Sequence, residues 1–102
     1  ITSYDINSNP INVSELLINK LSGKKLYISL DVDSLDPKFI PCTGTKVDEG
    51  INIDSLCKIV YEINKQCDIV CSDIVEFNPQ LGEQSDVDIS IKNILKYIKS
   101  IL

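Results

Sequence analysis

Two short apolar segments separated by one amphipathic segment restrict what this chain can fold into more than any other feature. Residues 25–31 (KLYISLD) and 68–77 (DIVCSDIVEF) have the length and the β-branched and aromatic content of β-strands. Between them, residues 53–66 carry apolar side chains at the three- and four-residue spacing of a helix. Strand, helix and strand in this order form a βαβ unit, which predicts an α/β fold with parallel strands.

A short helix is predicted before the first strand. Asn12 has a side chain suited to an N-cap, and Glu15 follows three residues later, as in a capping box. The helix therefore covers residues 13–22, and Gly23 supplies the left-handed residue that commonly ends a helix.

The last helix is predicted over residues 86–101, with Ser85 or Asp86 as its N-cap. Its apolar residues recur at helical spacing, which predicts that one face packs on the core. The residues assigned to that face are Val87, Ile91, Ile94 or Leu95, and Ile98.

The first strand is apolar almost throughout, which is typical of a strand buried on both faces of a parallel sheet. Two strands alone cannot form a sheet that is covered on both faces. The chain also begins at Ile1 and contains no methionine, so we expect it to be processed or to be a piece of something longer. It is predicted to be one part of a larger α/β domain or to oligomerise extensively.

Composition excludes several kinds of chemistry. The chain has no histidine, which excludes histidine-based catalytic triads and histidine-ligated zinc within these residues. Its formal net charge is −5 and all its basic residues are lysines, which disfavours binding to a nucleic-acid backbone. No apolar stretch approaches the roughly 18 residues of a membrane span, so we expect the chain to lie outside the membrane.

The four cysteines do not form a recognisable metal-binding or disulfide framework. Nothing resembles a signal peptide, and the spacing lacks paired Cys-x-x-Cys knuckles, so a structural zinc site is disfavoured. We expect reduced and mostly buried thiols. The cysteines are Cys42, Cys57, Cys67 and Cys71.

Acidic residues gather where the two predicted strands end. Asp31 and Asp33 lie two residues apart, so an extended backbone would point both side chains to one side. A right-handed crossover would bring Glu76 to the same sheet edge, where ligands of parallel sheets bind. Carboxylates this close together favour a hard divalent cation such as Mn²⁺ or Mg²⁺. The long loop of residues 32–52 begins at this edge, and long loops in compact domains are usually functional.

Each of these signals also has a purely structural interpretation. The Asp-x-Asp pair could be a solvated turn, and Glu76 could be an ordinary surface residue of its strand. Asp73 is expected to be a buried structural carboxylate bonded to the backbone or to a lysine. Residues 43–45 (Thr-Gly-Thr) could form a simple turn.

The longer strings carry a resemblance to one family. Residues 29–37 (SLDVDSLDP) and 39–45 (FIPCTGT), followed by Gly50, resemble the second metal-binding signature of the ureohydrolases, and residues 73–79 (DIVEFNP) resemble their D-x-x-E-x-N-P segment. The motifs are closer to those of arginases than to those of agmatinases or formiminoglutamases. Agreement spans about residues 25–82. Cys42 departs from the signature, which usually has Gly, Ala or Ser after the proline.

The resemblance implies a fold, a reaction and an assembly. The fold would be the C-terminal portion of a three-layer α/β/α arginase-like domain with a parallel sheet. Residues 1–102 would be the C-terminal segment of a single ureohydrolase domain whose N-terminal part is not present. The reaction would be hydrolysis of L-arginine to L-ornithine and urea, with two Mn²⁺ ions activating the attacking water. The resemblance further implies a homotrimer in the cytoplasm.

The resemblance also implies roles for the residues that stand at the functional positions of the family motifs. Asp31 and Asp33 match metal ligands, whereas Thr45 and Glu76 match residues at the substrate guanidinium. A carboxylate suits that role because a planar guanidinium presents paired donors. No residue here is assigned as catalytic, because the family's histidine ligands and further aspartates come from an upstream part. The segment alone is therefore expected to be inactive.

Three other interpretations remain open. Agmatinase is the nearest alternative, because substrate choice depends on residues that this sequence does not contain. A dehalogenase-like phosphatase also uses an Asp-x-Asp loop, but Ser34 and Leu35 replace its usual threonine pattern. A non-enzymatic interaction module with decayed chemistry is disfavoured, because the residues carried over at the site are all intact.

Overall fold

The computed structural model describes all of residues 1–102. In chain order, the elements are α1 (Ser3–Ser8), α2 (Pro10–Leu21), β1 (Lys25–Asp31), the 3-10 turn η1 (Val32–Ser34), α3 (Ile53–Gln66), β2 (Asp68–Val75), the 3-10 turn η2 (Pro79–Leu81) and α4 (Gln84–Ile101). β1 and α3 have the predicted bounds. β2 ends at Val75, earlier than the predicted residue 77.

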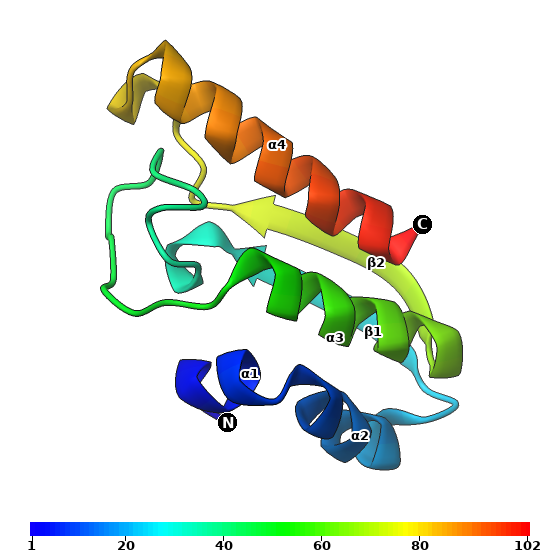
Figure 1. The fold of residues 1–102 in the computed structure, drawn as a ribbon. Helices are drawn as coiled ribbons and strands as arrows, with labels where there is room; N and C mark the ends of the chain where they lie inside the picture. Colours follow the sequence, from blue (N-terminus) through cyan, green and yellow to red (C-terminus); the bar gives the residue numbers. More distant parts are fainter.

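The two strands form a parallel sheet, as the βαβ pattern predicts. Helices α2, α3 and α4 lie side by side, with α3 in the middle, and pack over one face of this sheet (Figure 1). The short helix α1 lies next to the N-terminal end of α3 (Figure 1). The predicted α/β class is therefore confirmed, with all helices of this chain on one side of the strands.

The core lies between the sheet and the α3–α4 pair. Its largest member is Tyr97, whose side chain is fully buried and whose hydroxyl shares a 2.7 Å hydrogen bond with the Ser72 hydroxyl of β2. This bond satisfies the polar atom of an otherwise apolar contact, as burial of a hydroxyl requires. The remaining members of the cluster are Leu30, Val32, Leu35, Ile40, Ile53 and Val60.

The sheet is buried on one face only in this chain, which agrees with the expectation that two strands alone cannot form a sheet covered on both faces. The inner face packs on α3 and α4, whereas Tyr27 and Val70 on the outer face are each 58% exposed. The strand pairing has one irregularity. The partner of Leu26 is Ile69, but the partner of Tyr27 is Cys71, so Val70 is an extra residue in β2.

The beginning of the chain differs from the prediction. The N-cap of α2 is Asn9, whose side chain accepts a 3.2 Å hydrogen bond from the Asn12 backbone N–H, so Asn12 is inside the helix. Pro10 occupies the first turn, where its missing N–H has no structural cost. The helix α1 was not predicted, because six mostly polar residues carry no clear apolar period. A capping box between Thr2 and Asp5 begins it.

The α4 helix also begins earlier than predicted, and the predicted face is buried only in part, with Ile94 and Ile98 packed against the core. Its N-cap is Glu83, with the Asp86 side chain bonded back to the Glu83 backbone N–H, rather than Ser85 or Asp86. Ile91 and Leu95 are 43% and 49% exposed. The fully or nearly buried positions are Ser90, Asn93 and Tyr97.

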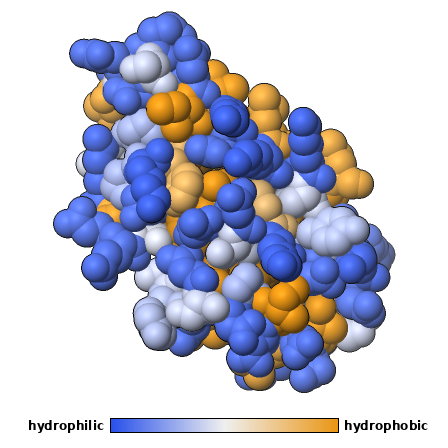
Figure 2. Space-filling view, in the orientation of Figure 1, coloured by the Kyte–Doolittle hydropathy of each residue, from blue (hydrophilic) through white to orange (hydrophobic).

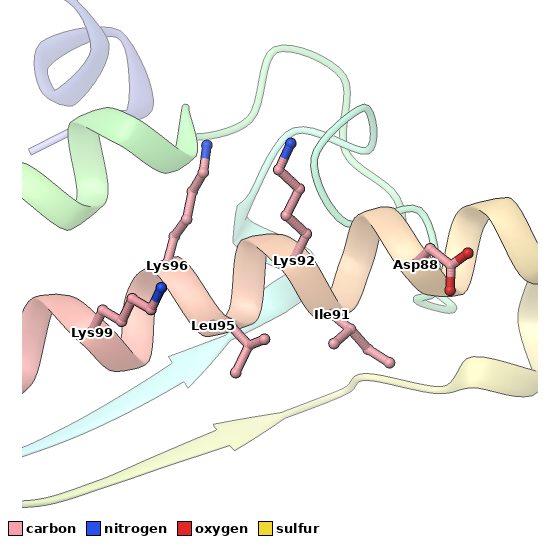
Figure 3. A pocket seen from close by; sticks show the side chains of 6 residues that line it. All are labelled: Asp88, Ile91, Lys92, Leu95, Lys96 and Lys99. Carbon is pink, nitrogen blue, oxygen red and sulfur yellow. The ribbon is translucent and has the colours of Figure 1, made fainter.

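Apolar periodicity predicted only part of the packed face of α4, because polar residues share that face with Ile94 and Ile98. The Asn93 amide donates a 2.7 Å hydrogen bond to the Phe39 carbonyl, which makes its burial possible. Ile91 and Leu95 instead line a surface hollow of about 440 Å³ together with Asp88, Lys92, Lys96 and Lys99, and their side chains point away from those of Lys92 and Lys96 (Figure 3). The helical side of the molecule is largely hydrophilic, with hydrophobic atoms visible between the helices (Figure 2).

All four cysteines are free thiols. Cys42 is buried, Cys57 and Cys67 are half-buried, and Cys71 is exposed on the outer face of the sheet, so the expectation of mostly buried thiols holds only in part. Burial, followed by the nearby Asp54 charge, raises the pKa of Cys57. None of the helices combines the length and the apolar composition that crossing a membrane requires.

Candidate functional site

The two aspartates of the Asp-x-Asp pair meet through a turn. Asp31 is the last residue of β1, and the backbone then enters η1 rather than continuing as a strand. The Asp31 Oδ1 atom accepts a 2.9 Å hydrogen bond from the Asp33 backbone N–H, so Asp31 caps this turn. The structure therefore brings the pair together, but the reason given by the sequence, an extended backbone, is wrong.

Asp33 has a buried partner that the sequence interpretation missed. The Thr43 hydroxyl donates a hydrogen bond to Asp33 Oδ1, and Thr43 is only 3% exposed. Residues 43–45 are therefore more than a simple turn. Spacing alone could not have paired residues ten positions apart in a loop, although a Thr-Gly-Thr string beside an Asp-x-Asp pair was the available signal.

Glu76 lies at the same edge of the sheet as the aspartates. Asp31 is paired in register with Val75, so Glu76 is the first residue after the paired part of β2. It is exposed, and its backbone has a φ of 70°, which lies in the left-handed region that residues other than glycine rarely adopt. The chain therefore turns sharply at Glu76, and this turn is why β2 is shorter than predicted.

The loop that follows β1 and the loop that follows β2 are bonded to each other. The Asn78 backbone N–H donates a 2.9 Å hydrogen bond to the Cys42 carbonyl, and the Cys42 N–H donates a 3.4 Å bond to the Ser90 hydroxyl of α4. A Cβ added to Gly82 would lie 2.7 Å from the Cys42 sulfur. The cysteine that departs from the signature therefore fills a tight space beside a residue without a side chain.

Thr45 lies further along the same loop and is exposed. The far end of this loop is held by the chain around Gly50. The backbone of Ile51 pairs with Ser34 and Asp36, and a Cβ on Gly50 would lie 2.6 Å from the Asp36 nitrogen. The loop is thus fixed at both ends, and Thr45 lies in the exposed segment between them.

Asp73 is not the buried carboxylate that was expected. It lies on the outer face of β2, where it accepts a 2.6 Å hydrogen bond from Ser29 and another from the Tyr27 hydroxyl. These bonds, with Ser29 contributing most, hold the pKa of Asp73 below its usual range. The bond to Asp73 raises the pKa of Tyr27. The partners are therefore hydroxyl groups of the neighbouring strand, and neither the backbone nor a lysine.

The donor set suits part of a divalent cation site. Carboxylate oxygens of Asp31 and Asp33 are the ligands that Mn²⁺ and Mg²⁺ prefer. The chain contains no group of three or more His, Cys, Asp or Glu side chains that could hold a metal ion, so these two would supply a fraction of an octahedral shell. The four surface hollows of the chain are lined by other residues.

A parallel sheet with paired aspartates and a glutamate at its carboxyl edge defines an α/β protein with candidate ligand-binding side chains where parallel sheets bind their ligands. Comparison with known proteins then gives the family. The sequence matches the arginase family over residues 1–100, and the chain belongs to that family.

Curated relatives include both arginases and agmatinases. The chain is 38% identical to an Entamoeba histolytica arginase over 76 residues, covering 74% of this chain and 24% of that protein. It is 40% identical to human arginase-1 over 70% of this chain and 23% of that protein. It is also 34% identical to a Neisseria meningitidis agmatinase over 85% of this chain and 28% of that protein. The chain thus spans about a quarter of the length of these relatives.

Solved structures agree with the family. The chain resembles Entamoeba histolytica arginase in complex with L-ornithine, with a TM-score of 0.72 and 33% identity over 90% of this chain and 30% of that one. It resembles Bacillus subtilis arginase with a TM-score of 0.78 and 27% identity, covering 91% of this chain and 32% of that one. The predicted arginase-like fold is therefore confirmed for a segment of a ureohydrolase.

Proposed function

We propose that the complete protein is an arginase that hydrolyses L-arginine to L-ornithine and urea with Mn²⁺. The observation that supports this most directly is that Asp31, Asp33 and Glu76 share one sheet edge in a chain of the arginase family. The arginase with L-ornithine in its crystal structure supports the substrate class.

In this proposal, Asp31 and Asp33 contribute carboxylate oxygens to the manganese site. When bound, the cations would activate the water that attacks the guanidinium carbon. The contribution of this chain is orientation. The Asp33 backbone N–H occupies one oxygen of Asp31, which fixes the direction in which the other oxygen is presented.

Glu76 would bind the guanidinium group of the substrate, with Thr45 beside it. A carboxylate accepts two parallel N–H bonds from a planar guanidinium. The left-handed backbone at Glu76 turns the residue out of the strand at the edge where the aspartates lie, and this strain is of the kind found at ligand-binding positions.

We further propose that residues 1–102 are the C-terminal segment of one larger ureohydrolase domain. Tyr27 and Val70 leave the outer face of the sheet exposed, whereas parallel sheets are normally covered on both faces. The relatives are about four times longer than the stretch that this chain matches. The upstream part would complete the metal shell, so the segment alone would release no urea from arginine.

Agmatinase is the second candidate, because an agmatinase is among the relatives with more than 30% identity. Arginine and agmatine differ by the α-carboxylate, and no residue in this segment is assigned to that group. The ratio of kcat/KM values for the two substrates in the complete protein separates the candidates. An arginase prefers arginine, whereas a strong preference for agmatine contradicts the first proposal.

Glu76→Gln tests the substrate role. Replacing the carboxylate by a neutral amide removes a charge-assisted bond, so kcat/KM for arginine should fall about 10- to 100-fold in the complete protein. Manganese content should stay at the wild-type level, and Glu83→Gln at the N-cap of α4 is a control for the loss of one negative charge. An unchanged kcat/KM in Glu76→Gln contradicts the assignment.

Two further proposals rest on the family resemblance. The complete protein assembles as a homotrimer, which sedimentation equilibrium measures directly. It acts in the cytoplasm, which fractionation of the source cells would test.

A further inference from the structure

Thr43 joins the paired aspartates to the buried part of the molecule. Its side chain is almost fully buried, and its hydroxyl donates to Asp33 Oδ1. Asp33 in turn donates its backbone N–H to Asp31. One buried hydroxyl therefore begins a chain of hydrogen bonds that passes through both carboxylates.

The backbone around Thr43 is held from three directions. The Thr43 N–H donates a 3.0 Å bond to the Pro41 carbonyl. The preceding residue, Cys42, is fully buried, and its peptide groups are bonded to Asn78 and to Ser90. The hydroxyl that contacts Asp33 is therefore attached to a rigid support, and Asp33 itself is only half-buried.

We infer that Thr43 is a positioning residue for the cation site, because its hydroxyl fixes the orientation of the Asp33 carboxylate before a metal binds. This inference rests on the proposed function. A fixed carboxylate loses less side-chain freedom on binding a cation than a mobile one. The same hydrogen bond withdraws charge from Oδ1, which opposes binding, but the outer partners of metal ligands usually strengthen affinity overall.

Thr43→Val in the complete protein tests the inference. Valine has the same shape and the same β-branching but no hydroxyl, so the packing of this buried position is kept. Mn²⁺ affinity, measured by titration with electron paramagnetic resonance, should weaken about 10- to 100-fold. Thr43→Ser keeps the hydroxyl and should bind Mn²⁺ within about threefold of wild type.

Thr45→Val is the matched control, since it removes a threonine hydroxyl from the exposed part of the same loop. It should leave the Mn²⁺ dissociation constant within about twofold of wild type. Melting of the metal-free proteins shows whether each variant folds. If valine is not tolerated at position 43, Thr43→Ala removes the same hydroxyl with less bulk.

The outcomes separate this inference from the proposed function. Wild-type protein that binds Mn²⁺ and hydrolyses arginine, together with a folded Thr43→Val protein of unchanged Mn²⁺ affinity, overturns the role of Thr43 alone. Equal weakening in the Thr43→Ser and Thr43→Val proteins also overturns it, because the hydroxyl would then be irrelevant. Wild-type protein that binds no Mn²⁺ overturns both.

Discussion

The two faces of the β1–β2 sheet are built from alternate residues of the same strands, yet they differ in what stabilises them. On the inner face, Leu30 is buried against the helices, and one hydroxyl pair, Ser72 and Tyr97, is the polar contact. On the outer face, an ionised Asp73 is held by Ser29 and by the Tyr27 hydroxyl. The inner face is stabilised by burial of apolar area, and the outer face by hydrogen bonds to a charge.

This difference indicates how much each face contributes to the stability of the folded chain. Burial of apolar surface is the larger contribution to stability and needs no particular partner geometry. Hydrogen bonds to exposed charged groups contribute less, but they fix the position of each group. The outer face therefore adds little to stability, while its hydrogen bonds hold Asp73 against Tyr27 and Ser29 of the neighbouring strand.

The largest expected effect is on the inner face. Leu30→Ala should lower the free energy of unfolding by about 2–5 kcal/mol, because it leaves a cavity in the core. Val70→Ala on the outer face of the same sheet should change it by no more than about 0.5 kcal/mol in this chain. Urea denaturation measures both. Equal losses for the two variants would contradict the contrast between the faces.

A smaller effect is expected at the edge where the two faces end. Glu76→Gly should raise the free energy of unfolding by about 0.5–1 kcal/mol, because glycine adopts the left-handed backbone without steric cost. Gly23 has a φ of 77°, and a Cβ added there would contact no other atoms. The penalty of Gly23→Ala therefore comes from the left-handed backbone alone, and the free energy of unfolding should fall by about 1 kcal/mol. Changes of opposite sign at these two positions, measured by urea denaturation, are the expected result, and a loss of stability in Glu76→Gly contradicts it.

The smallest expected effect is the pH dependence of the outer face. Because hydrogen bonds hold the pKa of Asp73 below its usual range, the ionised carboxylate stabilises the folded chain above about pH 4, the ordinary aspartate value. This contribution is lost as the pH falls through the lower pKa of the folded state. Asp73→Asn should therefore flatten the fall of the urea midpoint below about pH 4. Asp68→Asn, in the same strand, is the control for net charge.

Local signals in the sequence predicted part of the fold well. The bounds of β1 and α3 were correct because alternation and helical spacing are properties of a few neighbouring residues. The packed face of α4 was predicted only in part, because Asn93 and Tyr97 are buried through bonds to distant residues, Phe39 and Ser72. Spacing along one helix contains no information about such partners.

The candidate site was predicted by residue type, and its geometry was not. The motif strings identified Asp31, Asp33 and Glu76, and the family membership that they implied is confirmed. The 3-10 turn between the aspartates and the contact of Thr43 with Asp33 depend on how a 21-residue loop folds back, as the span of residues 32–52 shows. The sequence gives no periodic signal for a loop of this kind.

The extra residue in β2 has a consequence at the level of the gene. Val70 and Cys71 both face outward. Every later residue of β2 therefore points to the opposite face from the one it would occupy if the strand alternated regularly through Val70. An in-frame loss of the single codon for Val70 would leave Ile69 and Cys71 opposite the neighbouring residues Leu26 and Tyr27. Regular alternation would then keep Asp73 outward and Ile74 inward, so selection should tolerate this deletion more readily than the loss of a paired, inward-facing residue such as Ser72.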